Sequence, residues 1–187
     1  MADAAYAPQK IAPEDYLVAE NEAATRHEFI DGAVYAMTGT SDRHNMLALS
    51  LSSRVLDHLP SRSQVFMSDM KLRIRDQGAT FYYYPDVFVS CAADDRASHH
   101  REKPVLIIEV LSPSTDRIDR AEKFRAYTAV PSLLEYVLAE PALPHVEVYR
   151  RRTAWSREDF EAGAQVRLES VDLDVAVDAL YRRLLSS

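Results

Sequence analysis

The sequence has a single cysteine and no long apolar run. Cys91 has no second cysteine with which to form an internal disulfide, so we expect a reducing, cytoplasmic location. No apolar stretch reaches the ~18 residues that a membrane-spanning helix needs, so we expect no association with a membrane. The first four residues lack the basic start and apolar stretch of a signal peptide, and none is expected.

Basic residues are also scarce, because 22 lysines and arginines stand against 29 aspartates and glutamates and give a net charge of −7. Binding to phosphates needs clustered lysine and arginine, so a general attraction to nucleic acid is not expected. Two short basic groups do occur, at residues 117–125 and 150–152. Either group could form a local basic patch, although such groups are ordinarily solvated faces that balance nearby acids.

In other respects the composition is that of an ordinary globular protein, with 47% hydrophobic and 27% charged residues. A chain of 187 residues can bury a substantial core, so we predict a single domain over residues 1–187. Residues 1–12 are expected to form a loose lead-in, and the sequence contains no internal repeat.

The first third of the chain predicts a helix, a hairpin and a second helix. Pro13 suits the first position of a short helix that ends near residue 21. Asp31-Gly32 lies between two apolar runs, which is a strong signal for a β-hairpin. Apolar residues then recur at four-residue spacing, which predicts a helix with one buried face from about Asp42 to Leu59. The recurring residues are Leu47, Leu51, Val55 and Leu59.

Strands are predicted through the middle of the chain. Residues 65–75 alternate between apolar and basic side chains, which is typical of a half-exposed strand. Gln77-Gly78 turns the chain into a second strand over residues 82–90, and the polar residues 92–102 are predicted to form a surface loop. The segment from Pro104 to Leu111 is continuously apolar at its centre, as expected for a strand covered on both faces.

The last third adds helices and strands. A helix capped by Ser114 or Thr115 is expected to run to about Ala129. Two further strands are predicted over residues 133–138 and 145–149, and an amphipathic helix over residues 175–185. The order of elements predicts an α/β (α+β) fold, in which a mixed β-sheet is flanked by helices and the N-terminal helix and hairpin form an extension.

Glu109 is the anomaly of the apolar strand. Burying an ionised carboxylate without a partner costs several kcal/mol, so Glu109 must be protonated, ion-paired or bound to a metal, unless it reaches solvent at the end of the strand. Asp86 follows Pro85 in the neighbouring strand, and proline marks an edge, a strand start or a bulge. Adjacent strands lie ~4.8 Å apart, so Asp86 and Glu109 can approach closely. Two such carboxylates repel each other unless a cation lies between them, and oxygen ligands suit Mg²⁺ or Mn²⁺.

Lys123 lies in the helix that follows the strand of Glu109, and it shares one helical face with Asp119 and Tyr127. An ordinary surface pair between Asp119 and Lys123 is one interpretation. In the other, the lysine is directed back at the carboxylates, where it orients a water molecule and stabilises developing negative charge.

These residues resemble the PD-(D/E)XK nuclease superfamily and, within it, the restriction-endonuclease family long labelled a domain of unknown function. Pro85-Asp86 in one strand, the run from Glu109 to Thr115 and the downstream Lys123 carry the resemblance, which covers roughly residues 13–150. Further matching elements are Arg26-His27-Glu28, Asp31-Gly32, His44, Asp119-Arg120, Tyr127 and Leu134-Glu135-Tyr136.

The resemblance implies a restriction-endonuclease-like core that acts as a metal-dependent DNA endonuclease. Asp86 and Glu109 would hold Mg²⁺ or Mn²⁺, with the backbone carbonyl of Val110 as a third ligand. The superfamily places a lysine two residues after the second acid, where this chain has Leu111. The resemblance therefore implies that Lys123 has taken over that role from the helix.

Glu28 and His44 are secondary candidates. The resemblance implies that Glu28 is an additional acid at the site, while its position beside a turn also permits an exposed hairpin residue. His44 opens the long helix, where capping or hydrogen bonding within that helix is preferred to a role as a ligand.

A second hypothesis makes the chain a non-catalytic binding or assembly protein on an inherited nuclease fold. Glu109 and Lys123 would then form a structural ion pair, and the acidic net charge favours this interpretation. Under the first hypothesis the partners are DNA and a second copy of the chain, because cutting both strands of a duplex needs two active sites.

Overall fold

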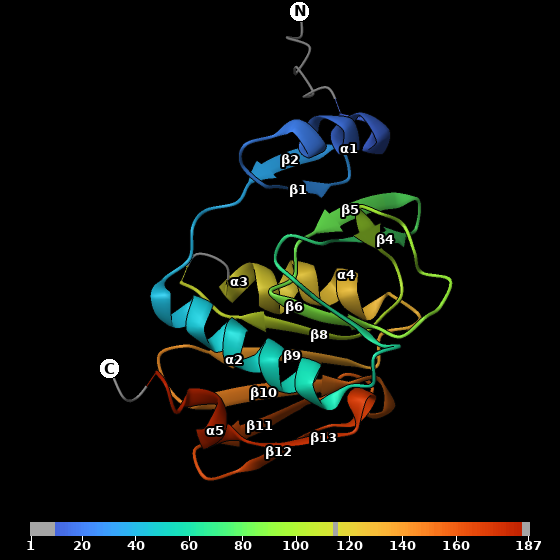
Figure 1. Cartoon of the computed structure of the whole chain (residues 1–187). Coiled ribbons are helices and arrows are strands. Elements are labelled where there is room, and N and C mark those ends of the chain that lie inside the picture. The colour runs from blue at the N-terminus through green and yellow to red at the C-terminus, as the bar shows by residue number, and fades with distance from the viewer. Residues whose placement is uncertain (1–9, 114–115, 185–187) are drawn as a thin grey trace, which may run out of the picture.

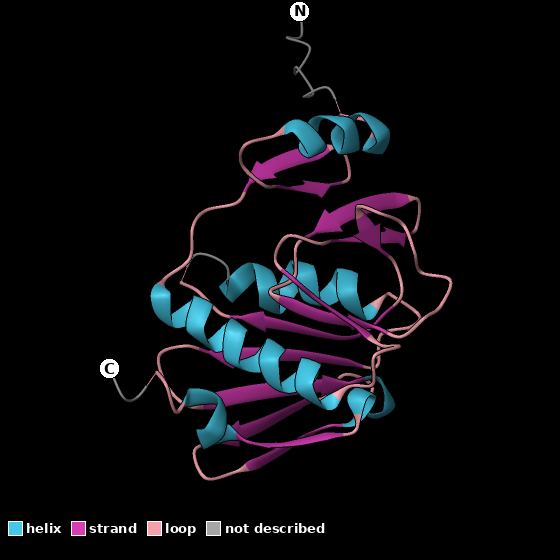
Figure 2. Cartoon of the chain, in the orientation of Figure 1, coloured by secondary structure: helices cyan, strands magenta, loops and turns pink. Residues whose placement is uncertain are grey.

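The computed structural model describes residues 10–113 and 116–184, and two β-sheets dominate it. A five-stranded sheet lies above a six-stranded sheet in Figure 1, and the helical segment from α3 to α4 packs between them. Helix α2 covers the opposite face of the six-stranded sheet. The predicted mixed sheet flanked by helices is therefore confirmed, and Figure 2 shows how helices and strands alternate through the layers.

The elements have the following bounds. The helices are α1 (Pro13–Glu22), α2 (Asp42–His58), α3 (Asp116–Ile118), α4 (Phe124–Thr128) and α5 (Val177–Tyr181), with a π-helical segment η1 (Asp119–Lys123) and two 3₁₀ turns, η2 (Arg151–Thr153) and η3 (Glu169–Val171). The five-stranded sheet has the order β2 (Ala33–Ala36), β1 (His27–Ile30), β5 (Ala79–Tyr83), β4 (Lys71–Asp76) and β7 (His100–Arg101). The six-stranded sheet has the order β11 (Arg157–Glu161), β10 (His145–Arg150), β9 (Glu135–Glu140), β8 (Pro104–Val110), β6 (Val87–Ser90) and β3 (Gln64–Met67). A two-stranded sheet pairs β12 (Gln165–Leu168) with β13 (Leu173–Ala176).

The N-terminal extension has the predicted form. The hairpin of β1 and β2 turns through Asp31 and Gly32, whose φ angles of 45° and 98° are the left-handed values that a tight hairpin turn requires. Helix α1 lies against this hairpin, where Tyr16 packs on Phe29 with ring centroids 5.0 Å apart. Of the expected lead-in, residues 1–9 lie outside the described residues, and the backbone of Ile11 donates to the Gly32 carbonyl at 3.0 Å.

Two predicted strands are each divided between the two sheets. The single strand predicted over residues 65–75 is wrong, because a turn closed by the backbone bond from Met70 to the Met67 carbonyl separates β3 from β4. The strand predicted over residues 82–90 breaks at Tyr84 and Pro85, since proline cannot donate to the ladder, and β5 and β6 therefore enter different sheets. The predicted surface loop is also partly wrong, because it contributes the short strand β7.

The helix predicted up to Ala129 exists but is not regular. Its proposed caps, Ser114 and Thr115, lie outside the described residues. From Asp119 to Lys123 the backbone forms a π-helix, which is rare and often marks a functional site. The terminal helix is shorter than predicted, because residues 173–176 pair as β13 and Leu185 lies outside the described residues. Over the described ranges, no helix is long and apolar enough to cross a membrane.

The core lies on both faces of the six-stranded sheet. One face packs against the predicted stripe of α2, in which Leu47, Leu51 and Val55 are buried. The other face packs against α4 and the underside of the five-stranded sheet, where Tyr127 and Tyr136 are fully buried. This second layer holds the side chains discussed next.

Candidate metal centre

Asp86 and Glu109 meet at the end of the antiparallel pair β6 and β8, as predicted. Val87 is opposite Ile108 in the register, so the preceding Asp86 comes opposite Glu109. The backbone N–H of Asp86 donates to Glu109 Oε2 at 3.2 Å, and the N–H of Val110 donates to Asp86 Oδ2 at 2.8 Å. The break at Pro85 thus places the two carboxylates and the Val110 backbone within hydrogen-bond reach of one another.

Glu109 does not reach solvent, because only 3% of its surface is exposed. Its Oε1 atom accepts a hydrogen bond from the Tyr127 hydroxyl at 2.8 Å and lies 3.2 Å from Lys123 Nζ. Burial raises the pKa of Glu109 to about 8, Lys123 opposes this rise, and Asp86 and Asp119 add to it. The carboxyl group is therefore held where its negative charge is poorly solvated.

Lys123 is not part of a plain surface pair. It is 6% exposed, and its ammonium group contacts three carboxylates at once. Burial alone would lower the pKa of Lys123, but the carboxylates hold it well above its ordinary value, so the side chain stays protonated. The distances from Nζ are 3.1 Å to Glu28 Oε1, 3.2 Å to Glu109 Oε1 and 3.4 Å to Asp119 Oδ1.

Glu28 comes from the N-terminal hairpin and reaches the same centre. Its side chain is 16% exposed and contacts Lys123, so the interpretation as an exposed hairpin residue is wrong. The hairpin brings it there because β1 pairs with β5 in the sheet that lies over α4. A segment far away in sequence thus supplies a fourth acid.

His44 opens α2, but its side chain does not stay within that helix. The helix is capped by Ser41, whose Oγ accepts from the His44 backbone N–H at 3.2 Å. The imidazole instead lies with Nε2 3.1 Å from Asp86 Oδ2, and it also bonds the Val110 backbone. Burial opposes protonation, yet Asp86 raises the pKa of His44 above its ordinary value. The preferred role within the helix is therefore wrong, and His44 orients Asp86.

The centre carries excess negative charge. Four carboxylates surround one ammonium group and one imidazole, which leaves at least two uncompensated charges when all four acids are ionised. Like charges at this separation destabilise each other unless a cation joins them. The acids are Glu28, Asp86, Glu109 and Asp119.

Sequence reasoning missed Tyr83 as a wall of the centre. Lys123 Nζ lies 5.8 Å from the centroid of the Tyr83 ring, whose hydroxyl donates to Glu122 at 3.2 Å. The run of three tyrosines before Pro85 was the available signal. Without knowing that β5 packs over α4, we could not predict that Tyr83 lies beside Lys123.

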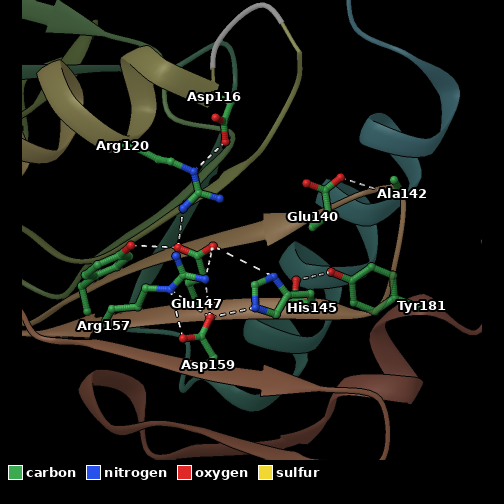
Figure 3. A network of polar contacts seen from close by, with 10 residues as sticks. Asp116, Arg120, Glu140, Ala142, His145, Glu147, Arg157, Asp159 and Tyr181 are labelled. Atoms are coloured by element: carbon green, nitrogen blue, oxygen red, sulfur yellow. Dashed lines mark hydrogen bonds and ion pairs between the residues drawn. The ribbon is translucent and has the colours of Figure 1, made fainter.

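A second polar cluster was also missed, on the outer strands β10 and β11 (Figure 3). His145 Nε2 lies 2.8 Å from Asp159 Oδ1, and Glu147 is buried beside them. These three residue types suit a metal, but the guanidinium group of Arg157 lies 3.3 Å from Glu147 and 2.6 Å from Asp159. Within the part of the chain that the structure describes, the cluster is thus balanced by its own cations, unlike the centre at Asp86 and Glu109.

Known proteins resemble this chain over most of its length. Two proteins of Synechocystis sp., both described as uncharacterized, are 36% identical over 179 residues and 35% identical over 141 residues. The first alignment covers 94% of this chain and 93% of the relative, and the second covers 73% and 78%. A crystal structure from Anabaena variabilis, described as a "putative nuclease belonging to DUF820", superposes with a TM-score of 0.76 at 20% identity, over 93% of this chain and 99% of that one.

The family model agrees with the fold and with the motifs. Residues 13–178 match the Uma2 model, which is described as "Putative restriction endonuclease". This range contains both strands of the centre, the hairpin with Glu28 and the π-helical segment with Lys123. The chain therefore belongs to the Uma2 family, a PD-(D/E)XK-like family of restriction-endonuclease-like proteins.

Proposed function

We propose that this protein is a metal-dependent endonuclease that hydrolyses phosphodiester bonds in DNA. The observation that carries the proposal is the charge imbalance of the buried centre, where four carboxylates share one ammonium group and one imidazole. A divalent cation removes this imbalance, and a phosphodiester brings a further negative charge that only a cationic centre accommodates.

The donor set fits Mg²⁺ or Mn²⁺. Asp86 and Glu109 provide carboxylate oxygens, and the Val110 carbonyl lies on the same side, where it already accepts from His44. Hard oxygen donors of this kind suit these ions. When bound, the ion polarises the phosphate and lowers the pKa of an attacking water molecule.

The protein's own residues then divide the remaining work. Lys123 stays protonated, so it acts as a donor that orients the water and offsets charge on the phosphorane, and it does not act as a base. Glu28 lies 3.1 Å from the ammonium group and is 16% exposed, which makes it the acid best placed to accept a proton from that water. His44 and Tyr127 hold the carboxylates of Asp86 and Glu109 in position.

Nicking of supercoiled plasmid DNA tests the proposal. Wild-type protein should nick with Mg²⁺ or Mn²⁺ but not with EDTA, and Glu109→Gln and Lys123→Met should each lower the rate at least 100-fold, in the range of a lost transition-state contact. Lys103→Met, at an exposed ion pair, is the matched control and should cut as the wild type does. Equal cutting by wild type and both site variants under every metal would exclude the proposal.

One observation favours a second candidate function, a non-catalytic binding or assembly protein. Lys123 is engaged by three carboxylates even without a cation, as a structural ion pair would be. Melting curves separate the two. If metal-free Glu109→Gln is more stable than wild type, the carboxylates are held together for a cation, and if it collapses with and without Mn²⁺, the pair is structural.

We also propose a cytoplasmic homodimer as the working form, since cutting both strands of a DNA at one place needs two centres. Light scattering on the purified protein measures its mass directly, with one chain of 21.2 kDa as the reference.

A further inference from the structure

Tyr35 is the one exposed aromatic side chain among the described residues. More than half of its surface, 54%, is open to solvent, while the other aromatic residues in these ranges are buried or partly buried. All four residues of β2 are exposed, so the ring of Tyr35 is accessible to a ligand. Tyrosine combines an apolar ring with a polar hydroxyl, which suits a side chain at a binding surface.

Its position links Tyr35 to the metal centre. In the hairpin register Tyr35 is directly opposite Glu28, and cross-strand partners share one face with Cβ atoms about 5 Å apart. Glu28 contacts Lys123 with that face, whereas the neighbouring pair, Phe29 and Val34, faces α1. Strand β2 is the edge of its sheet, so Tyr35 lies outward of Glu28, at the rim of the face that carries both side chains.

The net charge of the protein favours a substrate contact that does not depend on charge. With a net charge of −7, the chain gains little affinity for DNA from counterion release. Stacking of a base on an aromatic ring does not depend on charge and strengthens binding to single strands about 5-fold to 150-fold per base. Stacking requires a free base face, which bases inside a duplex do not offer because their neighbours cover them.

We propose that Tyr35 is a substrate-binding residue that stacks an unpaired base next to the scissile phosphate, and that single-stranded DNA, or DNA with an unpaired segment at the cut, is the substrate. This inference rests on the proposed nuclease function. It also assigns the hairpin two tasks, since Glu28 faces the reacting phosphate while Tyr35 holds the base beside it.

The competing occupant of this rim is a second copy of the chain. An edge strand presents unpaired backbone groups, and the exposed side chains of Val34 and Tyr35 could pack against those of a partner hairpin. The stacking role is favoured because Tyr35 and Val34 point to opposite faces of the sheet. A single flat interface with a partner hairpin could therefore not bury both side chains.

The experiment compares Tyr35→Ala, Tyr35→Phe and Val34→Ala. Val34→Ala is the matched control, because it shortens the neighbouring side chain on the opposite face of the same strand. Binding is measured in Ca²⁺ with a single-stranded oligonucleotide that carries 2-aminopurine, whose fluorescence falls on stacking. Cleavage is measured in Mn²⁺ on the same sequence as a single strand and as a duplex.

We expect wild type, Tyr35→Phe and Val34→Ala to quench the probe and to cut the single strand in preference to the duplex. Tyr35→Ala should lose the quenching, bind about 10-fold more weakly and show a raised KM with little change in kcat. Unchanged quenching and KM in Tyr35→Ala, equal cutting of duplex and single strand, or loss of the dimer in Tyr35→Ala with normal binding per chain would each overturn the inference. Quenching that depends on Tyr35 without cleavage by wild type would instead refute the nuclease function and leave the binding role standing.

Discussion

Replacing Lys123 by methionine should destabilise the protein far more than loss of an ordinary lysine. Methionine keeps most of the side-chain volume but removes the ammonium group that three carboxylates contact. Lys123 is only 6% exposed, so water cannot readily replace it. Breaking a buried ion pair from one side costs about 3–5 kcal/mol. For a chain of this size, that loss lowers the melting temperature by roughly 6–20 °C.

Urea unfolding in EDTA measures the effect, with Lys103→Met as control. Lys103 pairs with Asp94 on the surface, where the two side chains are 47% and 72% exposed, so its loss should cost less than about 1 kcal/mol. The double variant Lys123→Met with Glu109→Gln should be more stable than Lys123→Met alone by about 1–3 kcal/mol, because one orphaned charge is gone. Mn²⁺ should restore part of the stability of Lys123→Met. A cost for Lys123→Met no larger than that of Lys103→Met would refute the charge argument.

Three further predictions concern other parts of the fold. Burial and the cation of Arg73 lower the pKa of His100 to about 4, whereas His100 in the unfolded chain takes up a proton near pH 6.5. The stability of the folded chain should therefore fall by up to about 3 kcal/mol as the pH drops from 6.5 to 4. His100→Asn should flatten this dependence in urea titrations. Gly32→Ala should cost roughly 1–3 kcal/mol in thermal melts, because a Cβ there meets Lys10 at 2.6 Å, whereas Gly78→Ala, with a φ of +86° but no atom within 4 Å, should cost less. Tyr127→Phe should cost about 1–3 kcal/mol, because Glu109 loses a donor at 2.8 Å, and unchanged stability would mean that water replaces the hydroxyl.

The approach of Asp86 to Glu109 could be predicted from the sequence, because each residue interrupts the pattern of its own strand. Glu109 interrupts an apolar strand, and Asp86 follows a proline in a strand, so each is anomalous against its neighbours alone. The division of residues 65–75 between two sheets could not be read in the same way. Ser68 and Asp69 interrupt the alternation, but no glycine or proline marks the turn, and only the tertiary pairing shows which half joins which sheet.

Contacts between distant segments could not be predicted from local patterns, because they depend on how strands and layers pack in the folded chain. The polar cluster of β10 and β11 depends on the register that places Glu147 opposite Asp159. Strand β11 was not predicted because it has only one apolar residue, Phe160, and so shows no alternation. His44 was misjudged because a helix-opening histidine has local partners in any helix, whereas its actual partner, Asp86, arrives from another layer.

The assembly of one centre from both sheets has a consequence for folding. Glu28 comes from the five-stranded sheet, Glu109 from the six-stranded sheet, and Lys123 from the helical segment enclosed between them. A partly folded chain that keeps the larger sheet but has released the hairpin retains most of its secondary structure and yet has lost one wall of the centre. The pairing of Asp86 with Glu109 across β6 and β8 would remain, whereas the contact of Glu28 with Lys123 would be lost. That contact therefore depends on the docking of the two sheets, and it should be lost before circular dichroism records a large loss of strands.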